Sequence, residues 1–259
     1  MEQATKEDAQ RNRKVGPYQE IEKHWLREQV MSLPLYKRLL SESFGTFWIV
    51  FAGTGAIVAS DTSGGFPHVG VALVFGLVVF AMISALGDVS GAHFNPAVTI
   101  GFCFARRFPG KNVLPYVSSQ IAGALLGSAL VRALFPAHPT LGATLPAGTF
   151  LQSWILEVIL TLGLMFVVLS VSTGASEKGI TAGLAIGSLV GLEALFAGPI
   201  SGASMNPARS LGPAVISGHL ENILLYLTAP VVGASLAVLF CICTREKACC
   251  SGDPTQSCS

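Results

Sequence analysis

Charge is scarce in this chain. Lys, Arg, Asp and Glu make up 12% of the 259 residues, about half their share in an average globular protein. The 16 basic and 15 acidic residues leave a net charge of only +1. No basic excess therefore favours nucleic acid as a partner, and we expect none.

Cysteine is nearly absent from the first 240 residues. Five of the six cysteines lie beyond that point, namely Cys241, Cys243, Cys249, Cys250 and Cys258. A secreted disulfide framework would distribute its cysteines through the loops, so we expect a reduced cytosolic tail. Three interpretations of this cluster stay open: palmitoylation near a membrane, binding of a soft metal or trivalent arsenic, and unmodified thiols.

Catalytic patterns are missing as well. The five histidines are scattered, no Ser-His-Asp arrangement can be argued, and no glycine loop of phosphate-binding type is present. We therefore predict that the protein is not an enzyme and that it holds no cofactor and no metal. Residues 1–38 carry many charges and no apolar run, so we expect no cleaved secretory signal.

Hydrophobic residues, in contrast, make up 51% of the chain. They form six stretches that are long enough to cross a bilayer as helices. These stretches cover about 39–59, 70–87, 113–134, 151–171, 181–198 and 221–243. We predict an all-α, multi-pass integral membrane protein, with a membrane domain at 39–243 between tails at 1–38 and 244–259.

Two shorter apolar stretches, about 94–104 and 205–216, cannot span a membrane, and each includes an Asn-Pro pair. Proline suits the first turn of a helix, where its missing N–H has no partner in any case. We therefore predict half-helices that begin at Pro96 and Pro207, enter the membrane and return.

Basic residues predict the orientation of these segments. Three segments that connect or follow the spans contain basic residues: the connection after the first half-helix, the 172–180 connection and the C-terminal tail. These residues are Arg106, Arg107, Lys111, Lys178, Arg245 and Lys247. The 60–69 and 135–150 connections contain no Lys or Arg. Because Lys and Arg favour the cytoplasmic side, both termini are predicted to be cytosolic. The expected location is a plasma membrane or a bacterial inner membrane.

The chain also contains an internal repeat. Its two copies, at about 39–134 and 151–243, align on two triplets: Asn95, Pro96 and Ala97 over Asn206, Pro207 and Ala208. Gly76 and Gly187 each lie 19 residues before their asparagine, and Glu42 and Glu157 occupy matching spans. Since each copy has three spans, the second copy is inverted in the membrane and the half-helices meet near the midplane. Irregular backbone at that depth is tolerated where it lines a water-filled cavity, so a pore is expected.

Two Asn-Pro-Ala triplets in an inverted repeat, the second continuing to Arg209, resemble the aquaporin or major intrinsic protein family over about residues 36–243. The runs 196–206 and 226–230 are most similar to the nodulin-26-like branch of plants and its bacterial counterparts. The resemblance implies a passive channel in the lipid bilayer, assembled as a homotetramer. It would conduct water and small uncharged solutes and exclude protons and ions.

The residues at the midplane have two interpretations each. Asn95 and Asn206 are expected to donate to a passing solute oxygen, while the facing helix N-termini repel cations; the alternative is that both only cap their helices. Glu42 and Glu157 are expected to accept hydrogen bonds from the re-entrant loops, the bracing role that the resemblance implies, although buried carboxylates otherwise suggest function. His93 is expected to line the cytosolic half of the pore or to pack against its loop.

The resemblance assigns a selectivity filter to four positions, which are Phe75, Ala194, Ala203 and Arg209. Water-selective relatives typically have histidine at the position of Ala194, so two alanines predict a wider and more apolar filter. Possible solutes are then glycerol, urea, ammonia and undissociated metalloid acids, besides water. Ser210, where glycerol-type relatives carry aspartate, argues against a dedicated glycerol channel, and the bulk of Phe75 argues against the widest filters.

Three other functions stay open: a strict water channel, a transporter coupled to an ion, and a structural membrane protein that does not conduct. A transporter would require carboxylates near the midplane, and only Glu193 has no other assignment. Glu193 either tunes the filter or faces a neighbouring helix or subunit and is hydrogen-bonded there.

Overall fold

The computed structural model describes residues 33–65, 67–172 and 178–244. The two predicted tails therefore lie almost entirely outside the described residues, and with them Arg245, Lys247 and the last three cysteines. Within the described ranges all regular secondary structure is helical, and six helices are long and apolar enough to cross a membrane. The prediction of an all-α membrane protein is confirmed.

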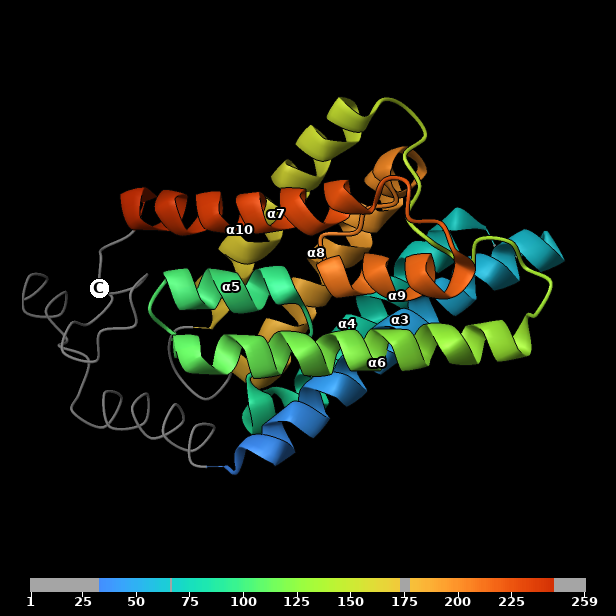
Figure 1. Ribbon diagram of the computed structural model, residues 1–259. Helices are drawn as coiled ribbons and strands as arrows, with labels where there is room; N and C mark the ends of the chain where they lie inside the picture. The colour runs from blue at the N-terminus through green and yellow to red at the C-terminus, as the bar shows by residue number, and fades with distance from the viewer. Residues whose placement is uncertain (1–32, 66, 173–177, 245–259) are drawn as a thin grey trace, which may run out of the picture.

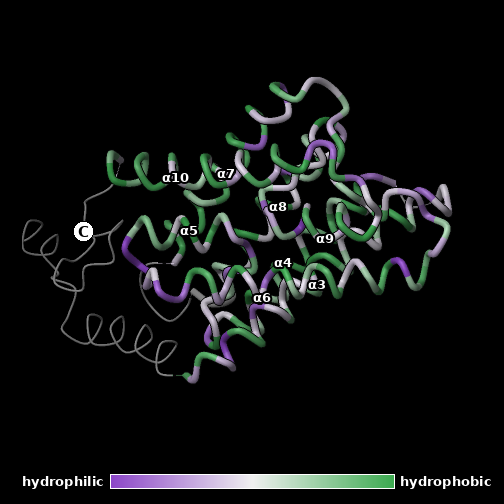
Figure 2. Tube along the Cα trace, in the orientation of Figure 1, coloured by the Kyte–Doolittle hydropathy of each residue, from purple (hydrophilic) through white to green (hydrophobic). Residues whose placement is uncertain are grey.

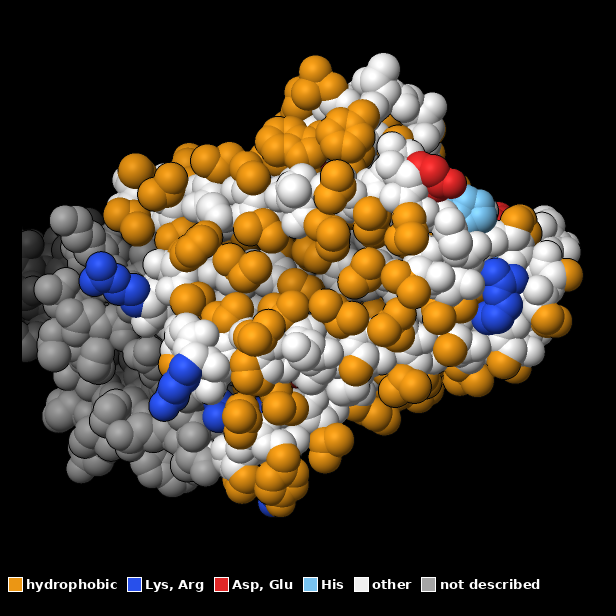
Figure 3. Space-filling model, in the orientation of Figure 1, with side chains coloured by type: hydrophobic (Ala, Val, Ile, Leu, Met, Phe, Trp, Pro, Cys, Tyr) orange, Lys and Arg blue, Asp and Glu red, His pale blue; other side chains and the backbone are white. Residues whose placement is uncertain are grey.

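The six long helices run somewhat beyond the predicted spans at most ends. They are α3 (Leu35–Ser63), α4 (His68–Ser90), α6 (Val113–Leu134), α7 (Phe150–Val171), α8 (Lys178–Ser201) and α10 (Ile223–Thr244). Hydrophobic residues dominate α10 along its length (Figure 2). On the face drawn in Figure 3, hydrophobic side chains cover the middle of the molecule and charged side chains lie toward its two ends. This pattern suits a protein surrounded by lipid.

Two short helices, α5 (Pro96–Phe104) and α9 (Pro207–Ser217), begin at the predicted prolines. A single 3-10 turn, Gly110–Asn112, connects α5 to α6. Figure 1 shows α5 and α9 end to end between α10 and α6. Each half-helix packs on the last long helix of the other repeat, α5 on α10 and α9 on α6. The two repeats are thus interlocked and related by a pseudo-two-fold axis, as in other inverted repeats.

The axis passes between α4 and α8, which cross closely because glycine occupies the contact. A Cβ placed on Gly187 would lie 2.5 Å from the carbonyl oxygen of Gly76, and a Cβ on Gly76 would lie 2.7 Å from the carbonyl oxygen of Gly187. These are the two glycines that the repeat alignment pairs. Only a residue without a side chain allows backbones to approach this closely.

Helix α8 continues through Pro199 to Ser201, whereas the predicted span ended at residue 198. Proline lacks the N–H that would bond to the carbonyl four residues earlier, here Leu195. That carbonyl oxygen instead contacts Nε2 of His68, at 2.9 Å, from the start of α4. Neighbouring helices can satisfy a carbonyl freed by proline in this way, so the helix is not interrupted.

We predict that Gly187→Ala lowers the free energy of unfolding by about 1 to 3 kcal/mol, because the added methyl meets backbone that cannot move aside. Gly87→Ala in α4 is the matched control, since apart from the adjoining backbone of its own helix nothing lies within 4 Å of its Cβ position. Thermal unfolding of both variants in detergent, followed by circular dichroism, measures the difference. Equal unfolding temperatures for Gly187→Ala and the unmodified protein would contradict the close crossing.

Candidate functional site

Asn95 and Asn206 cap the two half-helices. The side-chain oxygen of Asn95 accepts a hydrogen bond from the backbone N–H of Ala97 at 2.8 Å, and that of Asn206 accepts from Ala208 at 3.0 Å and Arg209 at 3.3 Å. Asparagine is among the best residues for this position because its oxygen satisfies N–H groups that have no partner in the helix.

The same two side chains also join the repeats to each other. The amide nitrogen of Asn95 donates to the carbonyl of Met205 at 2.8 Å, and that of Asn206 donates to the carbonyl of Phe94 at 2.9 Å. Each amide has two N–H groups, so one N–H per asparagine remains beyond this cross-link. Capping is therefore not the whole role of these side chains in the structure.

The loops before the half-helices have an unusual backbone that repeats in both copies. Ala92 and Phe94 in one loop, and Ala203 and Met205 in the other, have positive φ angles between 41° and 53°. This region is unfavourable for residues other than glycine. Loops that contain left-handed residues can turn successive N–H groups toward one side, where they form a concave site for an anion.

Glu157 supplies that anion in the second repeat. Its carboxylate accepts from the backbone N–H of Ser204 and of Met205, both at 2.8 Å, and from the hydroxyl of Ser201 at 2.7 Å. The side chain is fully buried. Because a buried carboxylate requires several donors, the loop and the glutamate stabilise each other.

Glu42 occupies the equivalent position in the first repeat. It accepts from the backbone N–H of His93 at 2.9 Å and of Phe94 at 2.7 Å, and from the hydroxyl of Ser90 at 2.6 Å. A fourth donor, the amide of Gln120, lies 2.7 Å away. The geometry therefore supports the bracing interpretation of both glutamates.

Two tyrosines hold the same loops from the other side, and sequence reasoning missed them. The hydroxyl of Tyr116 in α6 donates to the carbonyl of Ser90 at 2.9 Å, and that of Tyr226 in α10 donates to the carbonyl of Ser201. Their signal was available, because the tyrosines lie 21 and 20 residues after their asparagines and each serine lies five residues before.

His93 packs against its own loop and also lies in a cavity wall. Its Nδ1 lies 3.1 Å from the hydroxyl of Thr99, and its ring packs against Phe102, Phe108 and Tyr116. It also lines a cavity between the helices, which is about 430 Å³ in volume. The ring is therefore held in place by its loop and its neighbours while one part contacts open space.

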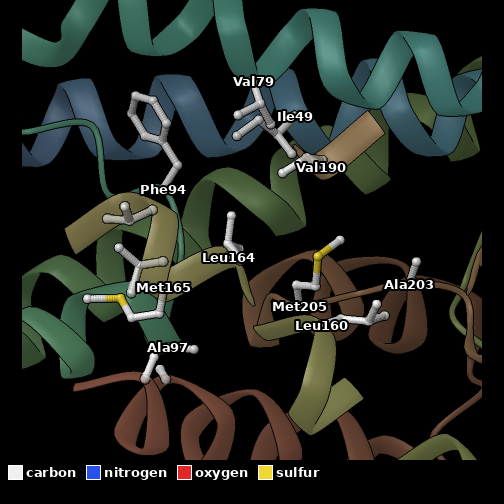
Figure 4. Packing of buried hydrophobic residues seen from close by; sticks show 14 of the residues in the cluster. Ile49, Val79, Phe94, Ala97, Leu160, Leu164, Met165, Val190, Ala203 and Met205 are labelled. Carbon is white, nitrogen blue, oxygen red and sulfur yellow. The ribbon is translucent and has the colours of Figure 1, made fainter. Parts of the chain in front are cut away.

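A cavity of about 430 Å³ runs past both asparagines. Its walls come from α3, α4, α7 and α8, and both re-entrant loops contribute to its lining. Figure 4 shows Ile49, Val79 and Val190 close together, from three of these helices. Apolar walls with a few polar groups are typical of sites that pass or bind small uncharged molecules.

The four predicted filter residues line this same cavity, although they lie far apart in the sequence. The guanidinium of Arg209 lies over the ring of Phe75, 5.1 Å from its centroid, and Arg209 is 2% exposed. Ala194 and Ala203 add only methyl groups to the wall. Arg209 also donates to the carbonyl oxygen of Gly142 at 3.1 Å, a contact from the 135–149 loop that sequence reasoning missed.

Glu193 does not line the cavity. Its side chain is buried at the contact of α8 with α7, where its Oε1 lies 3.0 Å from the Cβ position of Gly163. Among the described residues, Oε2 has no hydrogen-bond partner. Glu193 therefore faces a neighbouring helix, as one interpretation expected, but within the described part of the chain Oε2 does not make the hydrogen bond that this interpretation included.

Comparison with known proteins agrees with this architecture. The model of the family described as "Major intrinsic protein" matches residues 29–241. The chain is 48% identical to aquaporin NIP1-1 of Oryza sativa subsp. japonica over 78% of its length and 72% of the relative's. It is 44% identical to nodulin-26 of Glycine max, over 80% and 77% of the two chains.

A solved structure is similar as well. The aquaglyceroporin from Plasmodium falciparum superposes with a TM-score of 0.73 at 26% identity, covering 80% of this chain and 96% of that one. The resemblance inferred from the two Asn-Pro-Ala triplets is thereby confirmed, including the likeness to nodulin-26. The chain belongs to the major intrinsic protein family.

Proposed function

We propose that this protein is a passive membrane channel for water and small uncharged solutes. One observation carries the proposal: one cavity passes both asparagines at the facing helix N-termini and is lined as well by one arginine, one phenylalanine and two alanines, the four predicted filter residues. Membership in a family of channels supports the same function and gives no support to catalysis.

Ions are excluded by the charge distribution along this path. The N-termini of α5 and α9 each present positive partial charge at the cavity's midpoint, which repels cations. Arg209 adds a full positive charge at the filter. The free N–H groups of Asn95 and Asn206 orient a passing oxygen as an acceptor, which interrupts a proton-conducting chain of water.

The filter admits small uncharged solutes larger than water, besides water itself. Ala194 and Ala203 contribute only methyl groups to the wall, and the two large filter side chains, Phe75 and Arg209, lie against each other in the same lining. We infer that water and at least one of glycerol, urea, ammonia and metalloid acids pass. The solved relative described as an aquaglyceroporin supports this width.

We further propose the placement of the protein. The basic connections and the even number of spans support cytosolic termini, which puts the 135–149 loop and the filter on the outer side. The channel domain would cover 39–243, in a plasma or bacterial inner membrane, and the family resemblance supports a homotetramer with one pore in each subunit.

The solute profile tests the proposal directly. Proteoliposomes are exposed in a stopped-flow light-scattering instrument to an impermeant osmolyte, and then to glycerol, urea and boric acid. Compared with empty liposomes, we expect faster water flux and faster entry of at least one larger solute, with no dependence on proton or sodium gradients.

Each alternative has a distinct outcome in the same assay. Water flux with rejection of all three solutes indicates a strict water channel. Flux that follows an ion gradient indicates a coupled transporter. No flux above that of empty liposomes indicates a structural protein.

A substitution at one wall of the filter provides a second test. Ala194→His should reduce permeability to the larger permeant solute by about tenfold, a barrier change of about 1.4 kcal/mol, because an imidazole narrows the opening. Water permeability should change less. Ala194→Gly is the matched variant, since it keeps the site small and should retain the broad profile. If Ala194→His leaves the solute permeabilities unchanged, Ala194 is not part of the filter.

A further inference from the structure

The 135–149 loop contacts the filter arginine through the carbonyl group of Gly142. Nη1 of Arg209 donates to the carbonyl oxygen of Gly142 at 3.1 Å. Within the described residues this is the one protein hydrogen bond recorded for the guanidinium, whose Nε has no partner. The position of the arginine therefore depends on where the loop presents that carbonyl.

The carbonyl is presented by a tight turn that leucine does not favour. Leu141 and Gly142 have φ angles of 52° and 69°, and the N–H of Ala143 donates to the carbonyl of Thr140 at 3.0 Å. Two consecutive positive φ angles are characteristic of a type I′ turn. A residue other than glycine persists in such a backbone only where its surroundings hold it there.

Two contacts hold Leu141 in this conformation. Its side chain is fully buried in a cluster with Val58 of α3 and Val131 of α6. Its backbone N–H donates to Nδ1 of His138 at 3.0 Å. Gly142 follows directly and lies against Thr54, so closely that a Cβ on Gly142 would lie 3.0 Å from the Cβ of Thr54 and 3.1 Å from its carbonyl oxygen.

His138 is itself fixed by the two helices on either side. Because Nδ1 accepts a hydrogen bond, the ring proton is on Nε2, which faces Oδ2 of Asp61 at 3.3 Å. From α6, the guanidinium of Arg132 donates to the carbonyl oxygens of His138 and Pro136 at 2.8 and 3.0 Å. The imidazole is thus a buried, oriented acceptor beneath the turn.

We propose that His138 is a positioning residue for the selectivity filter: its Nδ1 holds the Leu141 turn, which presents the Gly142 carbonyl to Arg209. The proposal rests on the proposed channel function. His138 contacts no solute, and its effect passes through the backbone. When the acceptor is lost, the turn relaxes and Arg209 moves across the opening, which excludes large solutes more than it excludes water.

Two amide substitutions separate this role from simple packing. In His138→Asn the side-chain oxygen takes the place of Nδ1 and can accept from Leu141. In His138→Gln the amide lies one carbon further out, near the place of Nε2, and the acceptor beneath the turn is lost. The two variants differ by one methylene and carry the same chemical group, and His138→Leu removes both polar atoms.

The experiment measures the permeability ratio of the larger permeant solute to water in proteoliposomes, normalised to reconstituted protein, for the unmodified protein and all three variants. We expect His138→Asn to keep the ratio. His138→Gln should lower it by about threefold or more, a factor that corresponds to one net hydrogen bond, and His138→Leu should lower it as much.

The outcomes are separable from those of the proposed function. If the unmodified protein conducts and the Asn and Gln variants share its ratio, the positioning role of His138 is wrong. If both variants lower the permeability ratio of the larger solute to water equally, the imidazole acts by packing and the proposal is again wrong. If the unmodified protein conducts no solute, the proposed function fails instead. The comparison of Asn with Gln decides the question even if His138→Leu does not fold.

Discussion

The fold depends on one constraint, which is that backbone polar groups inside a membrane need partners other than water. The two re-entrant loops break the helical hydrogen-bond pattern at mid-depth and expose N–H groups there. Glu42 and Glu157 accept those N–H groups, two from the backbone of each loop. A carboxylate is costly to bury alone, and an exposed N–H group is costly too, but together they satisfy each other.

This mutual arrangement determines where the half-helices begin and how they meet. The braced loops bring Asn95 and Asn206 together, and each asparagine bonds to the chain segment that precedes the other. The backbone is therefore nearly symmetric about the midplane. The side chains differ between the repeats. Three residues after the asparagine, the first repeat has Val98 and the second has Arg209. Twenty residues before the asparagine, the first repeat has Phe75 and the second has Ile186. Val98 and Ile186 also line the cavity. One end of the cavity therefore carries a charged filter, and the other end does not.

Much of this architecture could be predicted because its determinants are local or periodic. Apolar stretches of sufficient length identify the six spans, proline identifies the starts of both half-helices, and the repeat implies inversion. The end of α8 was harder, because Pro199 normally marks a boundary. Only packing brings His68 within reach of the carbonyl that the proline frees.

The sequence by itself determined the spans, the repeat, the paired asparagines and the residue types available for a filter, since these follow from hydropathy, spacing and triplet identity. Only the tertiary structure decided that the 135–149 loop reaches Arg209 and that Glu193 lies outside the cavity. These contacts join segments far apart in the chain. Their geometry depends on helix packing and on left-handed backbone in short loops, and neither leaves a periodic signal in the sequence.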